Sequence, residues 1–509
     1  MRSRLMMLAL VFLTVLLATG CGGGSSSDGS GTGLSTAPQQ LRRDGRWLVD
    51  PQGRVVLLHG VNMVWKPAPH YPPDSAEGFR AADADWLADH GFNTARIGTL
   101  WVGVAPEPDH FDLAYLAHWD RVINLLASRK IWMLFDFHQD MLGPKFQGEG
   151  VPEWIVDEIT GPTTGVLGPP TFGFPFNYFT PQVSEAFDNL WAARGSPAWD
   201  NFRDAWRVVA TRYRNQDYSM GYDLLNEPWP GMEAVSCIVP PLVGCPGSDT
   251  NELQPFFEHA IAGIRQVDRN NLVWMETQTL SGGTGNPTGL VPIAGENQLG
   301  YSFHNYCGLT TGLQSAQLPI QLPVIEEQAC EVIDGNVFAN AREVADRIGA
   351  VELLTEFGAT DEPVLLKRVT RLADEQLVGW QYWHYKNWSD PTTQSQGSGA
   401  QSLFTDDDDL GTVKLDKLRI LERSYPQATA GVPLALSFDP DTAEFSYRFT
   451  PRASATAPTE IYVPVALHYP QGYLATVSGA TVTSAPNATR LVLANNAGAT
   501  EVSVTVTRP

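Results

Sequence analysis

The stretch GYDLLNEPW at residues 221–229 begins as an apolar run and ends in polar residues that include a carboxylate. Such near-continuous hydrophobicity is typical of a parallel strand buried on both faces. Similar runs lie at 55–62, 93–101, 131–138, 271–277, 299–306, 351–358 and 378–385. Helical patterns separate most of them, at 75–91, 114–130, 198–214, 252–269, 337–350 and 362–376. Eight strands alternating with helices predict an α/β protein built on a (β/α)8 TIM barrel.

Three segments depart from this repeat. Residues 280–298 are rich in Gly and Pro and show no helical pattern, and residues 46–60 predict a β-hairpin, with its turn at 50–53, that plugs the bottom of the barrel. Residues 141–185 form an insertion after the third strand, long enough to suggest a function. Its large apolar residues either pack on the barrel rim or are partly exposed: Phe146, Trp154, Ile155, Phe172, Phe174, Phe176, Tyr178 and Phe179.

The composition changes after a last helical pattern at 414–423. From about residue 431 onward, short alternating strands are separated by turn residues, which predicts a small β-sandwich. We therefore expect a catalytic barrel at 39–428 and a C-terminal β-sandwich domain at 429–509.

The N-terminus carries an export signal. Two arginines precede an apolar run at 5–20, which ends at Cys21 and predicts a signal peptide over residues 1–21. The small residues before Cys21 resemble a bacterial lipobox, whose cysteine is lipidated, although Leu17 lies one place early and an ordinary signal peptide is the alternative. The Gly/Ser-rich residues 22–38 would then form a flexible tether. We expect an exported protein, either a cell-envelope lipoprotein or a secreted one.

The remaining cysteines agree with export. An even number of them in an oxidising compartment suggests two disulfides, and three pairings are possible. Closure of the shorter loops favours Cys237 with Cys245 and Cys307 with Cys330. Their spacing is unlike that of a zinc site, so we expect no metal.

Charge narrows the possible partners. The chain has 34 Lys and Arg against 56 Asp and Glu, a formal net charge of −22. An acidic surface repels phosphate backbones, so nucleic acid is excluded as a partner, whereas a neutral substrate suits it. Beyond the N-terminal segment, no apolar run is long enough to span a membrane. We expect a monomer.

Two carboxylates end predicted strands. Glu227 ends the fourth strand and Glu356, in LLTEFGA, ends the seventh. Active sites of these barrels lie at the C-terminal ends of the strands. Glycoside cleavage requires two carboxylates, one to protonate the leaving oxygen and one to attack the sugar or activate water. Arg96, on the second strand, could hold Glu356 ionised.

Other strand ends supply residues that suit a sugar. Asn226 can donate a hydrogen bond to a 2-hydroxyl, and Trp383 offers an apolar face to a pyranose ring. Each residue alone has a structural explanation, such as an ion pair between Arg96 and Asp136. Their occurrence together at six strand ends favours a sugar-cleaving site. The remaining candidates are His138, His304 and Tyr306.

These residues resemble glycoside hydrolase family 5. In that family Asn-Glu-Pro carries the acid/base on the fourth strand and a Glu on the seventh strand is the nucleophile, which implies these roles for Glu227 and Glu356. The resemblance implies a retaining double displacement that needs no cofactor. The matching positions in this chain are Arg96, His138, Asn226, Glu227, His304, Tyr306, Glu356 and Trp383.

A narrower resemblance is to the endoglycoceramidases, which release the intact glycan from glycosphingolipids. It rests on HGVNMVWK (59–66), FDFHQDM (135–141), EGVPEW (149–154), YDLLNEPWPG (222–231) and the trailing β-sandwich. It implies that Lys66 and Asp136 grip the sugar next to ceramide, and that the protein meets its substrate at a membrane surface. Whether glucosyl- or galactosyl-linked ceramides are taken stays open. The alternatives are a β-glucanase or other polysaccharide hydrolase of the same family, and a non-catalytic carbohydrate-binding lipoprotein.

Overall fold

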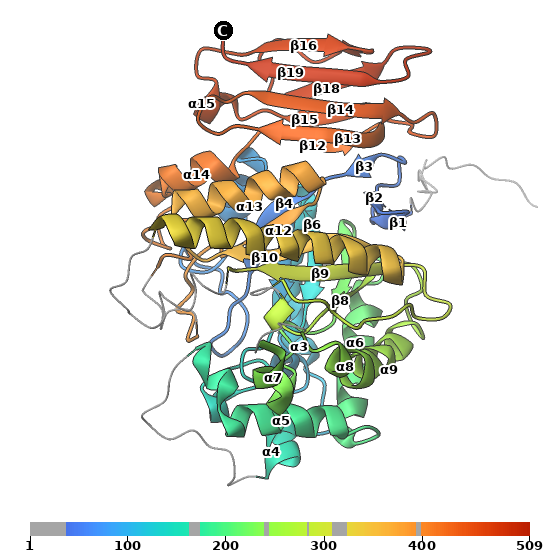
Figure 1. Cartoon of the computed structure of the whole chain (residues 1–509), viewed down its shortest axis with the longest axis vertical. Coiled ribbons are helices and arrows are strands. Elements are labelled where there is room, and N and C mark those ends of the chain that lie inside the picture. Colours follow the sequence, from blue (N-terminus) through green and yellow to red (C-terminus); the bar gives the residue numbers. More distant parts are fainter. Residues whose placement is uncertain (1–36, 162–173, 239–243, 282–284, 308–322, 393–398) are drawn as a thin grey trace, which may run out of the picture. The chain divides into compact units, whose positions relative to one another are not determined.

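Eight parallel strands close into a barrel in the computed structural model, which describes residues 37–161, 174–238, 244–281, 285–307, 323–392 and 399–509. The strands neighbour one another in the order β10-β11-β4-β5-β6-β7-β8-β9. Figure 1 labels β4, β6, β8, β9 and β10 among them. Each barrel strand lies within or overlaps one of the apolar runs, so the predicted barrel is confirmed. Their bounds are β4 His59–Met63, β5 Thr94–Gly98, β6 Trp132–Asp136, β7 Ser219–Asp223, β8 Val273–Glu276, β9 Leu299–Asn305, β10 Ala350–Gly358 and β11 Trp380–Trp383.

Helices follow most of these strands. Two of them begin with a side-chain cap: Asp112 accepts hydrogen bonds from the backbone of Ala114 and Tyr115, and Ser196 accepts one from Trp199. The prediction of no helix at 280–298 holds for the described residues 285–298, but Leu280 and Ser281 are helical. The helix expected from residue 337 begins earlier, because the Gly335-Asn336 pair looks like a break but lies inside it. The barrel helices are α1 Ala81–Asp89, α3 Leu113–Ser128, α6 Pro197–Tyr213, α9 Gln254–Ile264, α12 Pro323–Ile348 and α13 Pro363–Gln376.

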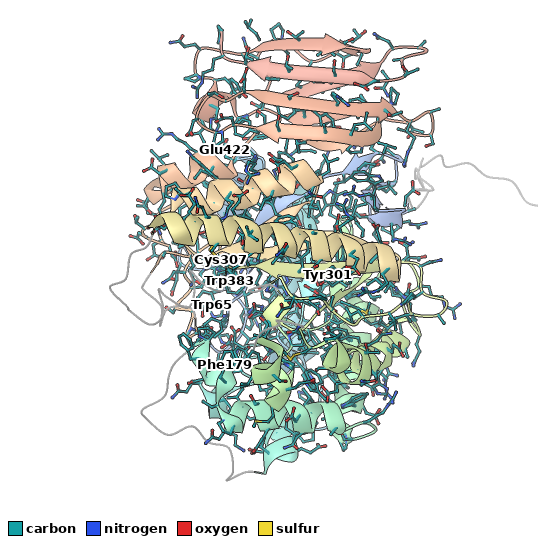
Figure 2. All side chains as sticks on the ribbon, in the orientation of Figure 1. Trp65, Phe179, Tyr301, Cys307, Trp383 and Glu422 are labelled. Atoms are coloured by element: carbon teal, nitrogen blue, oxygen red, sulfur yellow. A yellow bond between two sulfur atoms is a disulfide. The ribbon has the colours of Figure 1, made fainter. Side chains whose placement is uncertain are left out.

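The insertion after β6 is mostly packed structure. It contains α4 (Glu153–Thr160) and α5 (Pro181–Ala192), helices that the sequence analysis did not predict. Phe146, Ile155 and Tyr178 are buried, while Trp154 and Phe174 are half-buried and pack against the main core. Phe179 is 38% exposed (Figure 2). Packing therefore accounts for most of the described apolar residues, and Phe172 lies outside the described residues.

The N-terminal hairpin has two roles. It comprises β1 (Arg42–Asp44), β2 (Trp47–Val49) and β3 (Val55–Val56), and its turn closes where the backbone of Gly53 donates to Asp50 at 2.9 Å. Apolar side chains of the hairpin pack with those at the N-terminal ends of barrel strands, as the predicted plug requires. The second role was not predicted: β3 pairs with β12 (Tyr425–Thr429) of the C-terminal sheet. The run at 55–62 is therefore two strands, one for each sheet.

Two antiparallel sheets form the C-terminal sandwich. One has the order β1-β2-β3-β12-β15-β18-β17 and the other β13-β14-β19-β16, and their facing side chains share one apolar core. The helix α14 (Leu415–Leu421) precedes them, and the expected boundary at 428/429 falls inside β12. The remaining strands are β13 Gly431–Phe438, β14 Phe445–Pro451, β15 Thr459–Tyr462, β16 Leu474–Ser478, β17 Ala480–Val482, β18 Arg490–Asn495 and β19 Val502–Thr507.

Both disulfides pair as local closure predicts. Cys237 bonds to Cys245 with a Cα–Cα distance of 5.3 Å, and Cys307 bonds to Cys330 with one of 5.5 Å. The predicted signal peptide, Cys21 and nearly all of the tether lie outside the described residues. Among the helices within the described ranges, none is long and apolar enough to cross a membrane.

Candidate active site

Glu227 follows β7 in a constrained backbone. Its φ is +42°, in the left-handed region, which costs a residue with a Cβ about 1–2 kcal/mol. Gln139 Nε2 holds this segment by donating to the carbonyl of Asn226 at 2.8 Å and to that of Glu227 at 3.0 Å. The fixed turn directs the Glu227 carboxylate toward His304, whose Nδ1 lies 2.9 Å from Oε1.

Glu356 lies at an irregularity in β10. The register against β9 shifts between Leu354 and Glu356, and such bulges redirect side chains at barrel rims. Arg96 Nη1 donates to Glu356 Oε1 at 2.6 Å, and the Tyr306 hydroxyl donates to Oε2 at 3.1 Å. The predicted contact between Arg96 and Glu356 is confirmed.

The two carboxylates face each other across His304. One oxygen of Glu227, one oxygen of Glu356 and a ring nitrogen of His304 all lie within 4.8 Å of one another. Retaining glycosidases hold their carboxyl groups about 5–5.5 Å apart, whereas inverting ones need about 6.5–9.5 Å to admit a water. The spacing therefore fits retention. The Glu227 side chain is 12% exposed and that of Glu356 5%, so Glu227 has more access to solvent.

Arg96 is the buried cation of the site. Its Nε donates to Asp223 at 2.9 Å, and its Nη2 lies 3.0 Å from Asp136 Oδ1 and donates to Asn226 Oδ1 at 3.0 Å. Burial lowers the pKa of Arg96, but the surrounding carboxylates raise that pKa by more than burial lowers it. The guanidinium therefore stays charged. Asn226 is thereby fixed next to Glu227.

Burial raises the pKa of Glu356, whereas His304, Arg96 and His138 act to lower it. The hydrogen bonds from Arg96 and Tyr306 also favour the charged carboxylate. Neighbouring cations and donors thus oppose the rise in the pKa of Glu356 that desolvation causes.

His138 and Trp383 form one wall of the site. Their rings stack with centroids 5.1 Å apart, and Trp383 Nε1 donates to Gln401 at 2.8 Å. Burial lowers the pKa of His138, but hydrogen bonds to Asp136 and Asp140 outweigh it and raise that pKa to about 9. His138 is therefore charged at neutral pH.

Asp136 is buried between two other site residues. Its side chain is 0% exposed, with Oδ2 2.9 Å from His138 Nδ1 and Oδ1 beside Arg96. Its two oxygens thus face His138 and Arg96, which it supports. Lys66 Nζ instead lies 2.6 Å from Asp140 Oδ2 and 4.8 Å above the Trp383 ring. The carboxylate partner of Lys66 is thus the second Asp of FDFHQDM.

More acidic residues surround Lys66 than the sequence analysis predicted. Glu149 Oε1 lies 3.4 Å from Lys66 Nζ, and Asp390 Oδ1 lies 3.3 Å from it. Burial raises the pKa of Glu149, as do Asp140 and Asp390, while Lys66 opposes the rise. Glu149 lies in EGVPEW, so its motif was noticed, but its direction could not be read from the sequence.

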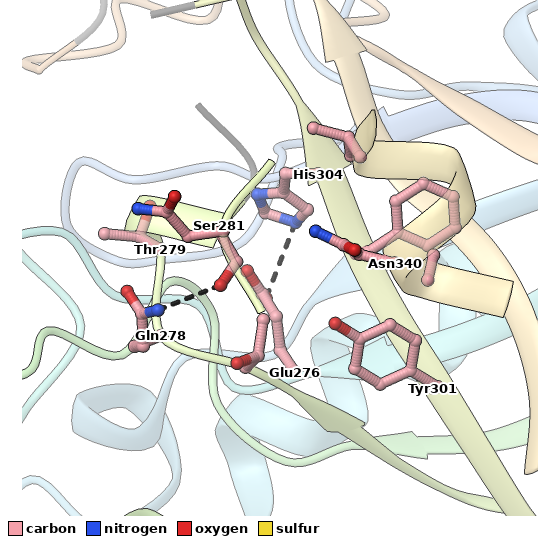
Figure 3. A pocket seen from close by; sticks show the side chains of 12 residues that line it. Glu276, Gln278, Thr279, Ser281, Tyr301, His304 and Asn340 are labelled. Carbon is pink, nitrogen blue, oxygen red and sulfur yellow. Dashed lines mark hydrogen bonds and ion pairs between the residues drawn. The ribbon is translucent and has the colours of Figure 1, made fainter. Parts of the chain in front are cut away.

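Glu276 was also missed, although it ends the fifth predicted strand. Its Oε2 accepts from the backbone N–H of Glu227 at 3.2 Å and lies 3.5 Å from His304 Nε2. Burial and nearby carboxylates raise the pKa of Glu276, and Arg96 opposes them. Figure 3 shows Glu276 and His304 at one side of a pocket whose polar lining includes Gln278, Ser281 and Asn340.

Among the described residues, two groups of side chains could present ligand atoms to a metal: Glu227, His304 and Glu356, and His138, Asp140 and Glu149. Each group already adjoins a buried protein cation. Arg96 contacts Glu356, and Lys66 contacts Asp140, each at 2.6 Å. These cations supply the positive charge that a metal would otherwise bring.

Comparison with known proteins agrees with this geometry. The profile described as Cellulase (glycosyl hydrolase family 5) matches residues 49–389, and the glycoside hydrolase family 5 C-terminal domain matches 423–507. Endoglycoceramidase I of Rhodococcus hoagii is 36% identical over 92% of this chain and 88% of its own length.

Solved structures of endo-glycoceramidase II from Rhodococcus sp. share the fold. The lactosyl-enzyme intermediate matches with a TM-score of 0.72 and 28% identity over 91% of this chain and 99% of the other. The ganglioside GM3 complex matches with a TM-score of 0.73 and 26% identity over 92% and 100%. The chain therefore belongs to glycoside hydrolase family 5, and within it to the endoglycoceramidase group.

Proposed function

We propose that the protein is a retaining endoglycoceramidase, which hydrolyses the β-glycosidic bond between the oligosaccharide and the ceramide of glycosphingolipids. The observation that carries the retaining mechanism is the approach of the Glu227 and Glu356 oxygens within 4.8 Å. The glycolipid substrate is supported by the similarity to endoglycoceramidase I and to the ganglioside-bound relative.

The reaction follows from the two carboxylates. Glu356 attacks the anomeric carbon while Glu227 gives its proton to the departing ceramide oxygen, which leaves a glycosyl ester on Glu356. Glu227, now a carboxylate, takes a proton from water. The resulting hydroxide oxygen attacks the anomeric carbon, releases the glycan with its original configuration and restores both side chains.

The surrounding residues are proposed to hold these groups and the sugar. Arg96 and Tyr306 orient the Glu356 nucleophile, and His304 contacts the Glu227 carboxyl. Trp383 offers its ring to the sugar. Lys66, with Asp140 in place of Asp136, supplies the polar contacts expected beside the ceramide-linked sugar.

Variants of the two carboxylates test the mechanism. Glu356→Gln and Glu227→Gln should each lose several orders of magnitude in turnover while remaining folded. A 2-fluoro-glycoside inactivator should attach to Glu356, and azide should restore turnover of an activated aryl glycoside by Glu227→Ala. Labelling at another carboxylate, or release of an inverted sugar, would refute the assignment.

A substrate panel tests the specificity. Purified protein is incubated with glucosyl- and galactosyl-linked glycosphingolipids and with β-glucans, and the released sugars are identified. We expect intact glycans from the glycolipids. Oligomers released only from β-glucan would favour a polysaccharide hydrolase, and no release from any substrate would favour a non-catalytic binding protein.

We also propose that the protein is exported and acts as a monomer at a lipid surface. The basic and apolar segment at 1–20 followed by Cys21 supports export, with lipidation of Cys21 as the anchor. In a bacterial host with its native signal, Cys21→Ala should move the protein from the membrane to the soluble fraction. An unchanged distribution would favour an ordinary secreted protein.

A further inference from the structure

Glu276 is a third carboxylate beside the Glu227–Glu356 pair. It ends β8 and is 2% exposed. Its Oε2 accepts a hydrogen bond from the backbone N–H of Glu227 at 3.2 Å and lies 3.5 Å from Nε2 of His304 (Figure 3). One oxygen therefore contacts both the peptide of Glu227 and the imidazole that the Glu227 side chain contacts.

The first contact bears on the backbone of Glu227. Its left-handed conformation is unfavourable for a residue with a Cβ, so contacts from outside must hold it. Gln139 holds the carbonyl side by donating to it at 3.0 Å. Glu276 holds the N–H side. Loss of the Glu276 contact to the N–H would let the peptide rotate and carry the Glu227 carboxyl away from His304.

The second contact bears on the proton of His304. A neutral imidazole carries one N–H, and its position depends on what each nitrogen faces. Glu276 Oε2, the oxygen that accepts from the Glu227 N–H, also faces Nε2 and favours the proton there. Nδ1, 2.9 Å from Glu227 Oε1, is then an acceptor for the O–H of a protonated Glu227. This tautomer suits an acid that must hold its proton until the leaving group departs.

We propose that Glu276 is a positioning residue for the acid/base: it holds the Glu227 peptide in its left-handed conformation and keeps the His304 proton on Nε2. This inference rests on the proposed role of Glu227. Glu276 does not act on the sugar, so its loss should slow only those steps in which Glu227 transfers a proton.

Leaving groups separate this role from a purely structural one. Ceramide departs only if its oxygen is protonated, whereas 2,4-dinitrophenolate departs without help. Glu276→Leu should lose about 10- to 100-fold in kcat/KM on a glycosphingolipid, the range of a lost hydrogen bond to a charged group, and less than about threefold on a dinitrophenyl glycoside. Glu276→Gln keeps an oxygen acceptor and should stay within about threefold on both substrates.

Glu352→Leu is the matched control. Glu352 is a buried carboxylate on β10 that pairs with Arg46 at 3.2 Å. Its loss should lower the melting temperature and leave the ratio of the two activities unchanged. Equal losses on both substrates in Glu276→Leu would overturn the proposal.

If Glu276→Leu does not fold, Glu276→Asp is used in the same way. Its side chain is one methylene shorter, so its carboxylate cannot reach both partners. We expect a smaller loss of kcat/KM, again greater on the glycosphingolipid than on the dinitrophenyl glycoside, and equal effects on the two substrates would overturn the proposal. Glu227→Ala distinguishes a failure of the proposed function from a failure of the role proposed for Glu276. If it shows no split between leaving groups, the proposed function fails; if it does and the Glu276 variants do not, only the role of Glu276 fails.

Discussion

Glu422→Gln should remove a pH-dependent loss of stability at a site between the barrel and the C-terminal sandwich. Glu422 follows α14 and is 5% exposed (Figure 2). Tyr462 of β15 donates to its Oε1 at 2.7 Å, and the same hydroxyl lies 2.9 Å from the carbonyl of Asp89. A hydroxyl has one hydrogen to donate. A protonated Glu422 can donate to Tyr462 and free that hydrogen for Asp89, so the neutral form suits this site.

Burial raises the pKa of Glu422 from 4.5 to about 7. A rise of this size corresponds to about 3 kcal/mol at 1.36 kcal/mol per pH unit. Below pH 4.5 the carboxyl is neutral in both the folded and the unfolded protein, so it costs nothing. As pH rises from 4.5 through 7 the folded protein must come to bury a charge, so its free energy of unfolding falls.

The variant cannot ionise, so its free energy of unfolding should exceed that of the parent by up to about 3 kcal/mol at pH 8 and match it near pH 4. Urea titrations followed by far-UV circular dichroism at several pH values measure this difference. Glu444→Gln, at an exposed carboxylate of the same sandwich, is the control and should show no such trend. A difference independent of pH, or one larger at low pH, would refute the reasoning.

Three further predictions concern the site and its rim. Phe179→Ser removes an exposed ring that packs on Trp229 at 4.8 Å, two residues after Glu227, and should raise KM for a glycosphingolipid while sparing a soluble aryl glycoside; equal effects in initial-rate assays would show that the ring is structural. Tyr306→Phe removes the donor to Glu356 Oε2 and should lower kcat by about tenfold in steady-state assays, and an unchanged kcat would exclude this hydrogen bond from the reaction. Replacing Cys307 and Cys330 together with Ser opens a loop with a sequence separation of 23 and should lower the free energy of unfolding by about 3 kcal/mol, whereas an unchanged denaturation midpoint would contradict this.

The barrel could be predicted because its strands are buried on both faces and so read as apolar runs. The division of the run at 55–62 between two sheets could not, since both halves are equally apolar and only pairing with β12 separates them. The helices of the insertion were missed for a related reason. They are short and flanked by segments rich in Gly and Pro, and their apolar residues find cover only when the barrel wall is present.

The site was predictable as a set of strand ends, but the direction of each side chain was not. Asp136 and Asp140 lie on either side of His138 in one motif, and both are buried. Only the folded arrangement brings the first to Arg96 and the second to Lys66. Glu276 ended a predicted strand, yet nothing local distinguishes it from a solvated glutamate. Its proposed role comes from contacts with Glu227, which follows β7, and with His304 on β9, both distant in sequence.

The pairing of β3 with β12 ties the beginning of the chain to its end. During synthesis β3 leaves the ribosome before the first barrel strand, and its partner follows only after the whole barrel has been made. Until then β3 is an unpaired edge, which can pair wrongly with other chains. The sandwich therefore also covers the open edge of β3. A chain truncated after the barrel would leave that edge permanently unpaired.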